Sequence, residues 1–119
     1  MSDTDTHTTF HELIADLRGP TREFRRSAPD AWEGFGALHK AAVDEGALPA
    51  STKELIALAI AVATHCDGCV AYHAKGAAVK GATRDEVVDA LAVALLMAGG
   101  PASVWAPRAL AAFDEFAVE

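Results

Sequence analysis

Apolar residues recur every three or four positions through most of the chain, which is the spacing of amphipathic helices. Glycine, proline and polar clusters separate these segments. The β-branched residues lie inside the helical periodicities rather than in alternating runs, so the pattern does not favour strands. We therefore predict an all-α bundle of about five or six helices, covering residues 10–18, 29–45, 52–64, 67–80, 83–98 and 102–116.

Two helix-breaking residues near the start of the chain suggest how it is divided. Gly19 and Pro20 are expected to stop the first helix. The chain would then consist of a polar N-terminal segment with a short helix, residues 1–20, and a helical domain, residues 21–119. The locally basic stretch 21–28 either extends the first helix or begins another.

Two stretches, Ser51–Glu54 and Thr83–Glu86, match the capping box, in which a hydroxyl and a carboxylate satisfy free amides at a helix start. The helix after the first box is apolar on nearly every face, and such a helix is buried within a subunit or between subunits. The chain is 51% hydrophobic but only 7% aromatic, and alanine, which is abundant, buries little area. We therefore expect a subunit that gains stability by forming a homo-oligomer.

The charge balance narrows the range of partners. The formal net charge is −7 and the pI is about 5.1, with no basic run, which argues against nucleic acid and anionic membranes. Residues 1–9 do not resemble a signal peptide, and the apolar stretches 55–63 and 90–98 are too short to span a bilayer. We expect a cytoplasmic protein, in which two nearby cysteines are typically catalytic or metal-binding.

The segment that carries chemistry contains Cys66, Cys69 and His73, which fall along one helix face. His73 lies one turn after Cys69 and can accept its proton, and a helix that begins near Asp67 also favours thiolate at its first turn. Exposure at the helix end favours Cys66 as the attacking sulfur, whereas the histidine favours Cys69, which we take as the base-activated thiol. Asp67 is a good N-cap residue, which favours a helix start here, but its negative charge disfavours a nearby thiolate. The sequence leaves open which of the two effects is larger.

Glu54 requires a separate argument, because on one continuous helix it would lie roughly 18 Å from Cys66. A turn within residues 64–68 would instead pack two helices antiparallel and bring His73 back beside Glu54. A hydrogen bond between them would orient the imidazole and raise its basicity, as the third member of a triad does. The predicted catalytic set is therefore Glu54, Cys66, Cys69 and His73, although Glu54 can also act as the last residue of its capping box.

A metal site is the alternative. His65, Cys66, Cys69 and His73 provide four potential zinc ligands, which would make the chain a non-enzymatic metal-binding or redox-sensing oligomer. These ligands are crowded into nine residues, however, whereas structural zinc sites usually draw ligand pairs from two separated segments. The redox interpretation is therefore preferred.

Other aromatic side chains receive structural interpretations. His39 lies on an apolar helix face and is expected in the core or an interface, and His65 is expected at a helix end. Tyr72 either lines the site or simply packs. Trp32 and Trp105 are expected to anchor a core or interface, and Trp105 could form a wall of the pocket.

The joint motif is glutamate, eleven residues, Cys-x-x-Cys, three residues and histidine. It resembles the alkylhydroperoxidase AhpD-like family within the carboxymuconolactone decarboxylase superfamily. The neighbouring stretches Lys53–Ala59 and Gly81–Val87 agree with this resemblance, which covers roughly residues 32–116. The joint motif is far more specific than Cys-x-x-Cys alone.

The resemblance implies an all-helical subunit that assembles into trimers or hexamers. It implies that Glu54, Cys66, Cys69 and His73 are catalytic, and that the cysteine pair reduces hydroperoxides or the disulfide of a partner peroxiredoxin. No bound cofactor is implied; an external dithiol donor, of lipoyl or thioredoxin type, would recharge the pair.

The chain departs from the family pattern at one position near the cysteines. Gly68 stands where the best-known members have a histidine. The chain is similar to the short single-domain members, so the peroxiredoxin partner need not carry over. The decarboxylases of the superfamily lack the cysteine pair, so their lactone chemistry is not transferred.

Overall fold

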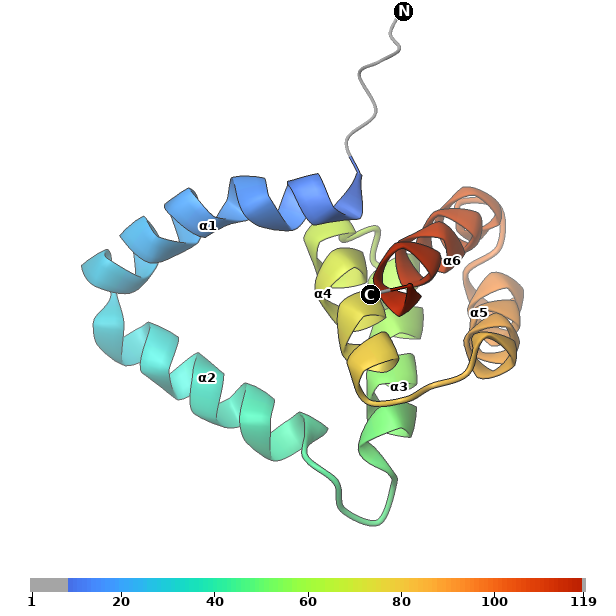
Figure 1. Cartoon of the computed structure of the whole chain (residues 1–119), viewed down its shortest axis with the longest axis horizontal. Helices are drawn as coiled ribbons and strands as arrows, with labels where there is room; N and C mark the ends of the chain where they lie inside the picture. The colour runs from blue at the N-terminus through green and yellow to red at the C-terminus, as the bar shows by residue number, and fades with distance from the viewer. Residues whose placement is uncertain (1–8, 119) are drawn as a thin grey trace, which may run out of the picture.

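The computed structural model describes residues 9–118, and within that range the chain is all-α without strands, as predicted. The helices are α1 (Phe10–Ser27), α2 (Pro29–Val43), α3 (Ala50–Ala63), α4 (Asp67–Val79), α5 (Arg84–Ala98) and α6 (Ala102–Ala117) (Figure 1). Among these described helices, none combines the length and the apolar character needed to cross a membrane.

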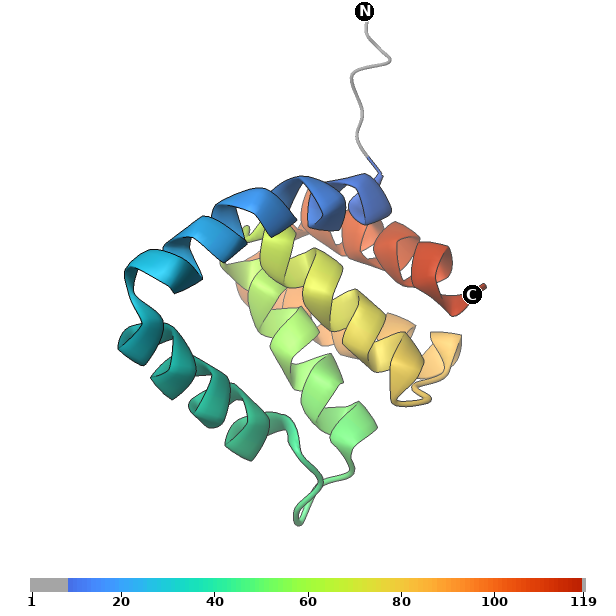
Figure 2. The ribbon, with the colours of Figure 1, turned by 60° about the vertical axis from the view of Figure 1, so that its left-hand side comes forward.

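Helices α3 to α6 form the body of the molecule. The antiparallel pair α3 and α4 lies at its centre, α6 packs along α4, and α5 packs against both α3 and α6 (Figures 1 and 2). The largest fully buried side chains, Leu58, Val62, Val70 and Val87, come from α3, α4 and α5. Burying a side chain of this size stabilises a fold by about 1.5–3 kcal/mol relative to leaving it exposed.

Alanine gives α4 its central position. Ala71, Ala74 and Ala77 are fully buried, at spacings that place them on neighbouring faces of this helix. Small side chains allow helix axes to approach closely. α4 therefore contacts α1, α3 and α6 at once, and the alanine-rich composition contributes to packing inside the subunit.

The first turns of α1 belong to the body, but the rest of α1 and all of α2 project from it. Phe10 and Ile14 are buried, and the Glu115 carboxylate on α6 accepts the amides of Phe10 and His11, both at 3.1 Å. Beyond them α1 continues outward and α2 returns toward the start of α3, as Figure 2 shows. No residue of α2 is buried. We call residues 19–43 the arm.

The helix end expected at Gly19 and Pro20 is wrong, because α1 continues through both residues. A proline leaves the carbonyl four residues earlier without its amide partner. Here that carbonyl belongs to Asp16, an exposed residue, where water can satisfy it. The helix ends instead before Pro29, which disfavours the helical conformation at Ala28. The domain boundary expected directly after Pro20 therefore falls inside a continuous helix.

One of the two predicted capping boxes is confirmed. The Thr83 hydroxyl accepts the amide of Glu86 at 3.1 Å, and the Glu86 carboxylate accepts the amide of Thr83 at 2.8 Å. The box expected at Ser51–Glu54 is wrong, because α3 begins at Ala50 without a side-chain cap. The carboxylate of Glu54 instead contacts His73 on α4 and Lys80 at the C-terminal end of α4. It therefore does not cap the start of α3.

Candidate functional site

A short turn between α3 and α4 reverses the chain. The Cys66 amide donates to the Ala61 carbonyl at 3.1 Å, and His65 adopts a positive φ of 57°. Non-glycine residues rarely enter this left-handed region, which commonly ends a helix. As a result α4 begins at Asp67 and returns along α3, which confirms the turn predicted within residues 64–68.

The two cysteines lie at the tip of α4 and form a disulfide, with their Sγ atoms 2.01 Å apart. Cys66 is the N-cap residue, and its sulfur accepts the amide of Cys69 at 3.2 Å. Free amides and the positive end of the helix dipole stabilise negative charge here, so this position favours a thiolate on Cys66 when the pair is reduced. Both residues are half-buried and border a cavity, so the expected juxtaposition of two accessible sulfurs is confirmed.

The antiparallel pair also brings Glu54 and His73 together. The Nδ1 atom of His73 lies 2.8 Å from Oε1 of Glu54, although the residues are nineteen positions apart. The side chain of Glu54 is almost fully buried, with 5% of its surface exposed. The side chain of His73 is 20% exposed. An ionised carboxylate can only accept, so it holds the shared hydrogen on Nδ1 and leaves Nε2 of the neutral imidazole free to accept a proton. The predicted contact is confirmed.

A lysine and a glycine complete the environment of Glu54. Nζ of Lys80 lies 3.9 Å from Oε2 of Glu54, whereas the imidazole of His73 contacts Oε1. A Cβ atom placed on Gly76 would lie only 2.6 Å from Cδ and Oε1 of Glu54. Any larger residue at position 76 would therefore displace the carboxylate. Gly76 was not among the predicted site residues, although a glycine in mid-helix signals close approach of another group.

A cavity of about 510 Å³ lies over the disulfide. The body contributes Cys66, Cys69 and His73 to its lining, and the arm contributes Trp32, Phe35, Gly36, His39 and Thr21. None of the cavity-lining residues carries a carboxylate, an ammonium or a guanidinium group. The surface around the sulfurs is consequently apolar and aromatic, with imidazole and hydroxyl groups as its polar atoms.

The structure shows which of the remaining aromatic side chains line the cavity and which do not. Tyr72 lines the cavity, as one of its two expected roles required. Trp105 packs against the core, as expected of an anchor, and stacks on His65 with ring centroids 5.9 Å apart; it does not line the cavity, whereas Trp32 does. His39 is exposed within the subunit rather than part of the core, and its ring stacks on His73 at 5.9 Å. Trp32 and His39 occupy these places because the arm folds back toward α4.

The four potential zinc ligands do not converge. His65 stacks on Trp105, His73 is hydrogen-bonded to Glu54, and the two cysteines are bonded to each other. In the described part of the chain no group of three or more histidine, cysteine, aspartate or glutamate side chains is arranged to hold a metal ion.

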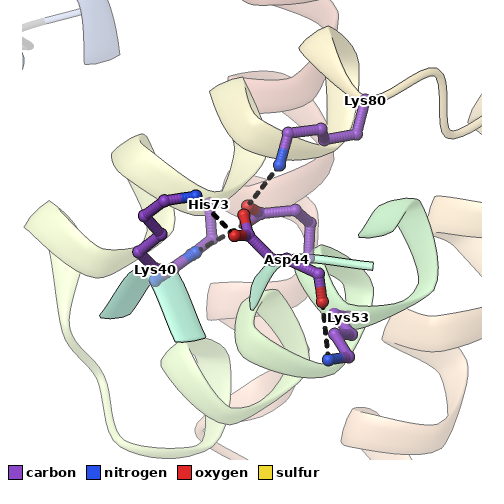
Figure 3. Close-up of polar contacts among 6 residues, drawn as sticks. Lys40, Asp44, Lys53, His73 and Lys80 are labelled. Carbon is purple, nitrogen blue, oxygen red and sulfur yellow. Dashed lines mark hydrogen bonds and ion pairs between the residues drawn. The ribbon is translucent and has the colours of Figure 1, made fainter. Parts of the chain in front are cut away.

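Two lysines contact Asp44 at the end of α2, and one of them, Lys53, comes from α3 (Figure 3). Nζ of Lys40 lies 2.6 Å from Oδ2 of Asp44, and Nζ of Lys53 donates to the backbone carbonyl of Asp44 at 2.7 Å. The hydrogen bond from Lys40 lowers the pKa of Asp44 and raises the pKa of Lys40 itself. Lys53 thereby holds the last turn of α2, the helix that carries His39.

Comparisons with known proteins agree with this architecture. The model of the carboxymuconolactone decarboxylase family matches residues 29–112. An uncharacterized protein of Cupriavidus necator is 44% identical over 109 residues, covering 86% of this chain and 96% of the relative. An uncharacterized protein encoded in the cox locus of Paracoccus denitrificans is 41% identical, covering 78% of this chain and 84% of the relative.

A solved structure is similar in both fold and sequence. The crystal structure of an apo carboxymuconolactone decarboxylase family protein from Legionella pneumophila superposes with a TM-score of 0.87 and 41% identity. The match covers 91% of this chain and 96% of that one. The family match includes Glu54, both cysteines and His73, and the similar structure has the same helical fold. The chain therefore belongs to the carboxymuconolactone decarboxylase family.

Proposed function

We propose that the protein is a thiol-dependent oxidoreductase that reduces hydroperoxides, or a partner disulfide, with the Cys66–Cys69 pair. One observation carries the proposal: the hydrogen-bonded Glu54–His73 pair and the cysteine pair border the same apolar cavity. A base that is fixed by a buried carboxylate beside a thiol is the arrangement that activates a sulfur nucleophile. Membership in a family that includes AhpD-like peroxidases agrees with this proposal.

In the first half of the proposed cycle the dithiol form of the protein reduces the hydroperoxide. Nε2 of His73 accepts the proton of Cys69, and the thiolate attacks the terminal oxygen of the hydroperoxide. An S–O bond forms and the O–O bond breaks, so the substrate leaves as an alcohol once it has gained a proton. Cys66 then attacks the sulfenic acid on Cys69 and expels water, which leaves the disulfide seen in the structure.

Recharging the pair requires two electrons and two protons from outside the chain. The proposed donor is a dithiol, such as a lipoyl group or a thioredoxin-type protein, which becomes a disulfide itself. Its thiolate attacks Cys69, and Cys66 is the leaving sulfur. The position of Cys66 at the N-terminus of α4 favours this choice, because a stabilised thiolate leaves faster. No bound cofactor takes part in the proposed cycle.

Turnover of an organic hydroperoxide with several dithiol donors tests the proposal. Wild type should turn over, and Cys69→Ser should lose activity to the level of the uncatalysed reaction. Cys66→Ser should reduce about one equivalent of peroxide and stop with a sulfenic acid on Cys69, detected by mass after trapping. Wild type without dithiol activity, or with stoichiometric zinc that survives dialysis, would contradict the proposal.

Assembly into a homo-oligomer, a trimer or hexamer, is a second part of the proposal. It is supported by large apolar side chains that the subunit leaves exposed on α3 and α5: Ile56, Ile60, Val93, Leu96 and Met97. Contiguous exposed apolar surface is typical of interaction sites. Light scattering should give the mass of several chains, and Ile60→Glu should lower it. A monodisperse wild-type monomer would contradict this part alone.

A further inference from the structure

A second imidazole borders the cavity, and the proposed cycle does not yet use it. His39 projects from α2, so it reaches the cavity from a different element than the cysteines, which lie on α4. Its ring faces that of His73, with centroids 5.9 Å apart and an angle of 21° between the planes. Among the described residues that line the cavity, His39 and His73 are the two that carry an imidazole, a group that can both accept and donate a proton.

The proposed chemistry needs two proton transfers at two different places. One proton leaves the attacking thiol, and His73, one turn from Cys69 and bound through Nδ1 to Glu54, is placed to accept it. The other proton must reach the leaving oxygen. In a displacement at oxygen the leaving atom departs on the side opposite the attacking sulfur. It therefore moves away from α4 and toward the rest of the cavity, which the arm lines.

We propose that His39 is the general acid of the reaction, donating a ring proton to the oxygen or sulfur that leaves the substrate in the cavity above Cys69. This inference rests on the proposed thiol-dependent function. The thiolate of Cys69 forms a bond to the terminal peroxide oxygen, the O–O bond breaks, and the alkoxide takes the proton of the His39 imidazolium. The products are the sulfenic acid, a neutral alcohol and a neutral imidazole. Sulfur is oxidised by two electrons and the peroxide is reduced by two.

The surroundings of His39 fit this role. The residue is exposed, so solvent can return its proton after each turnover. Its charged neighbour in sequence, Lys40, is paired with Asp44, which offsets a positive charge close to the imidazole. The bond from Lys53 to the Asp44 carbonyl ties the end of α2 to the body and so keeps the histidine over the site. On α4, His73 and Tyr72 are the polar side chains on the facing wall.

Dependence on the leaving group separates this role from a structural one. An alkyl hydroperoxide releases a strongly basic alkoxide, whereas a peroxycarboxylic acid releases a weakly basic carboxylate that needs no proton. In single-turnover reduction by the dithiol protein, His39→Gln should slow the alkyl hydroperoxide by about 100-fold and the peroxy acid by less than about threefold. Glu33→Gln, an exposed change on the same helix that does not border the cavity, should leave both rates at wild type.

A chemical rescue gives a second measurement. His39→Ala leaves an opening at the edge of the cavity, and added imidazole should restore the rate with the alkyl hydroperoxide but not change the rate with the peroxy acid. Equal slowing of both substrates by His39→Gln would overturn the proposal, and so would wild-type rates with both. A wild-type protein that reduces neither substrate would overturn the proposed function itself, which makes the two failures distinguishable.

Discussion

The body and the arm meet at the same cavity but are built differently. In the body, α3, α4 and the turn between them carry Glu54, both cysteines and His73, and both helices contain fully buried core residues such as Leu58 and Val70. The arm supplies the opposite wall, yet α2 buries no residue and its backbone approaches only α1 and α3. Elements with few buried contacts open at low free energy. The groups that activate sulfur are therefore held by buried packing, whereas the wall with Trp32 and His39 depends on exposed contacts, such as the bond from Lys53 at the end of α2.

The largest expected effect tests this difference in packing directly. Leu58→Ala in α3 removes a fully buried side chain and should lower the free energy of unfolding by about 2–5 kcal/mol. Leu38→Ala in α2 removes a side chain that is 64% exposed and should change it by less than about 0.5 kcal/mol. Urea denaturation measures both. A comparable loss for Leu38→Ala would mean that another surface, such as a second copy, covers the arm.

The next largest effect is expected at Glu54, the carboxylate that is hydrogen-bonded to the base His73. Glu54→Gln should lower kcat/KM at neutral pH by about 100-fold, because an amide does not stabilise the imidazolium that forms when His73 accepts a proton. The rate should be measured beside a thermal melt, which separates lost chemistry from lost folding. Wild-type turnover in this variant would remove Glu54 from the mechanism.

A pair of glycine substitutions compares the packing around the site with that of the arm. Gly76→Ala forces a Cβ atom against the Glu54 carboxylate and should cost about 1–3 kcal/mol of stability while lowering turnover about tenfold. Gly34→Ala in α2 meets open space and should stabilise the helix by about 0.5–1 kcal/mol with unchanged turnover. Denaturation and initial rates of both variants provide the comparison. A neutral Gly76→Ala would show that Glu54 can shift without consequence.

The smallest effect is expected at the exposed carboxylate of Asp44, which directly follows the arm. The hydrogen bond from Lys40 lowers the pKa of Asp44, so the stability that this pair contributes is present above the ordinary aspartate pKa. It is lost as the pH falls through the lowered pKa. Because both side chains are more than half exposed, Asp44→Asn should barely change the melting temperature at pH 7, and the difference from wild type should vanish in acid. A large loss at pH 7 would show that the α2 anchor is stronger than its exposure suggests.

Local signals were enough to predict much of the fold. Helices α4, α5 and α6 lie close to their predicted bounds because periodicity, the Thr83 cap and Gly81 act over a few residues. The pairing of Cys66 with Cys69 follows from their spacing at a helix start. The same local reasoning failed at Gly19 and Pro20, where an exposed helix tolerates the proline.

The sequence by itself determined where most helices lie and that two thiols stand within bonding distance at a helix start, because both features depend on neighbours within one or two turns. The antiparallel turn that joins Glu54 to His73 could still be predicted, since only a short loop separates their helices. Only the tertiary structure placed Gly76 against the carboxylate and brought Trp32 and His39 over the disulfide. Those contacts depend on the angle at which whole helices pack, and residue spacing along the chain does not encode that angle.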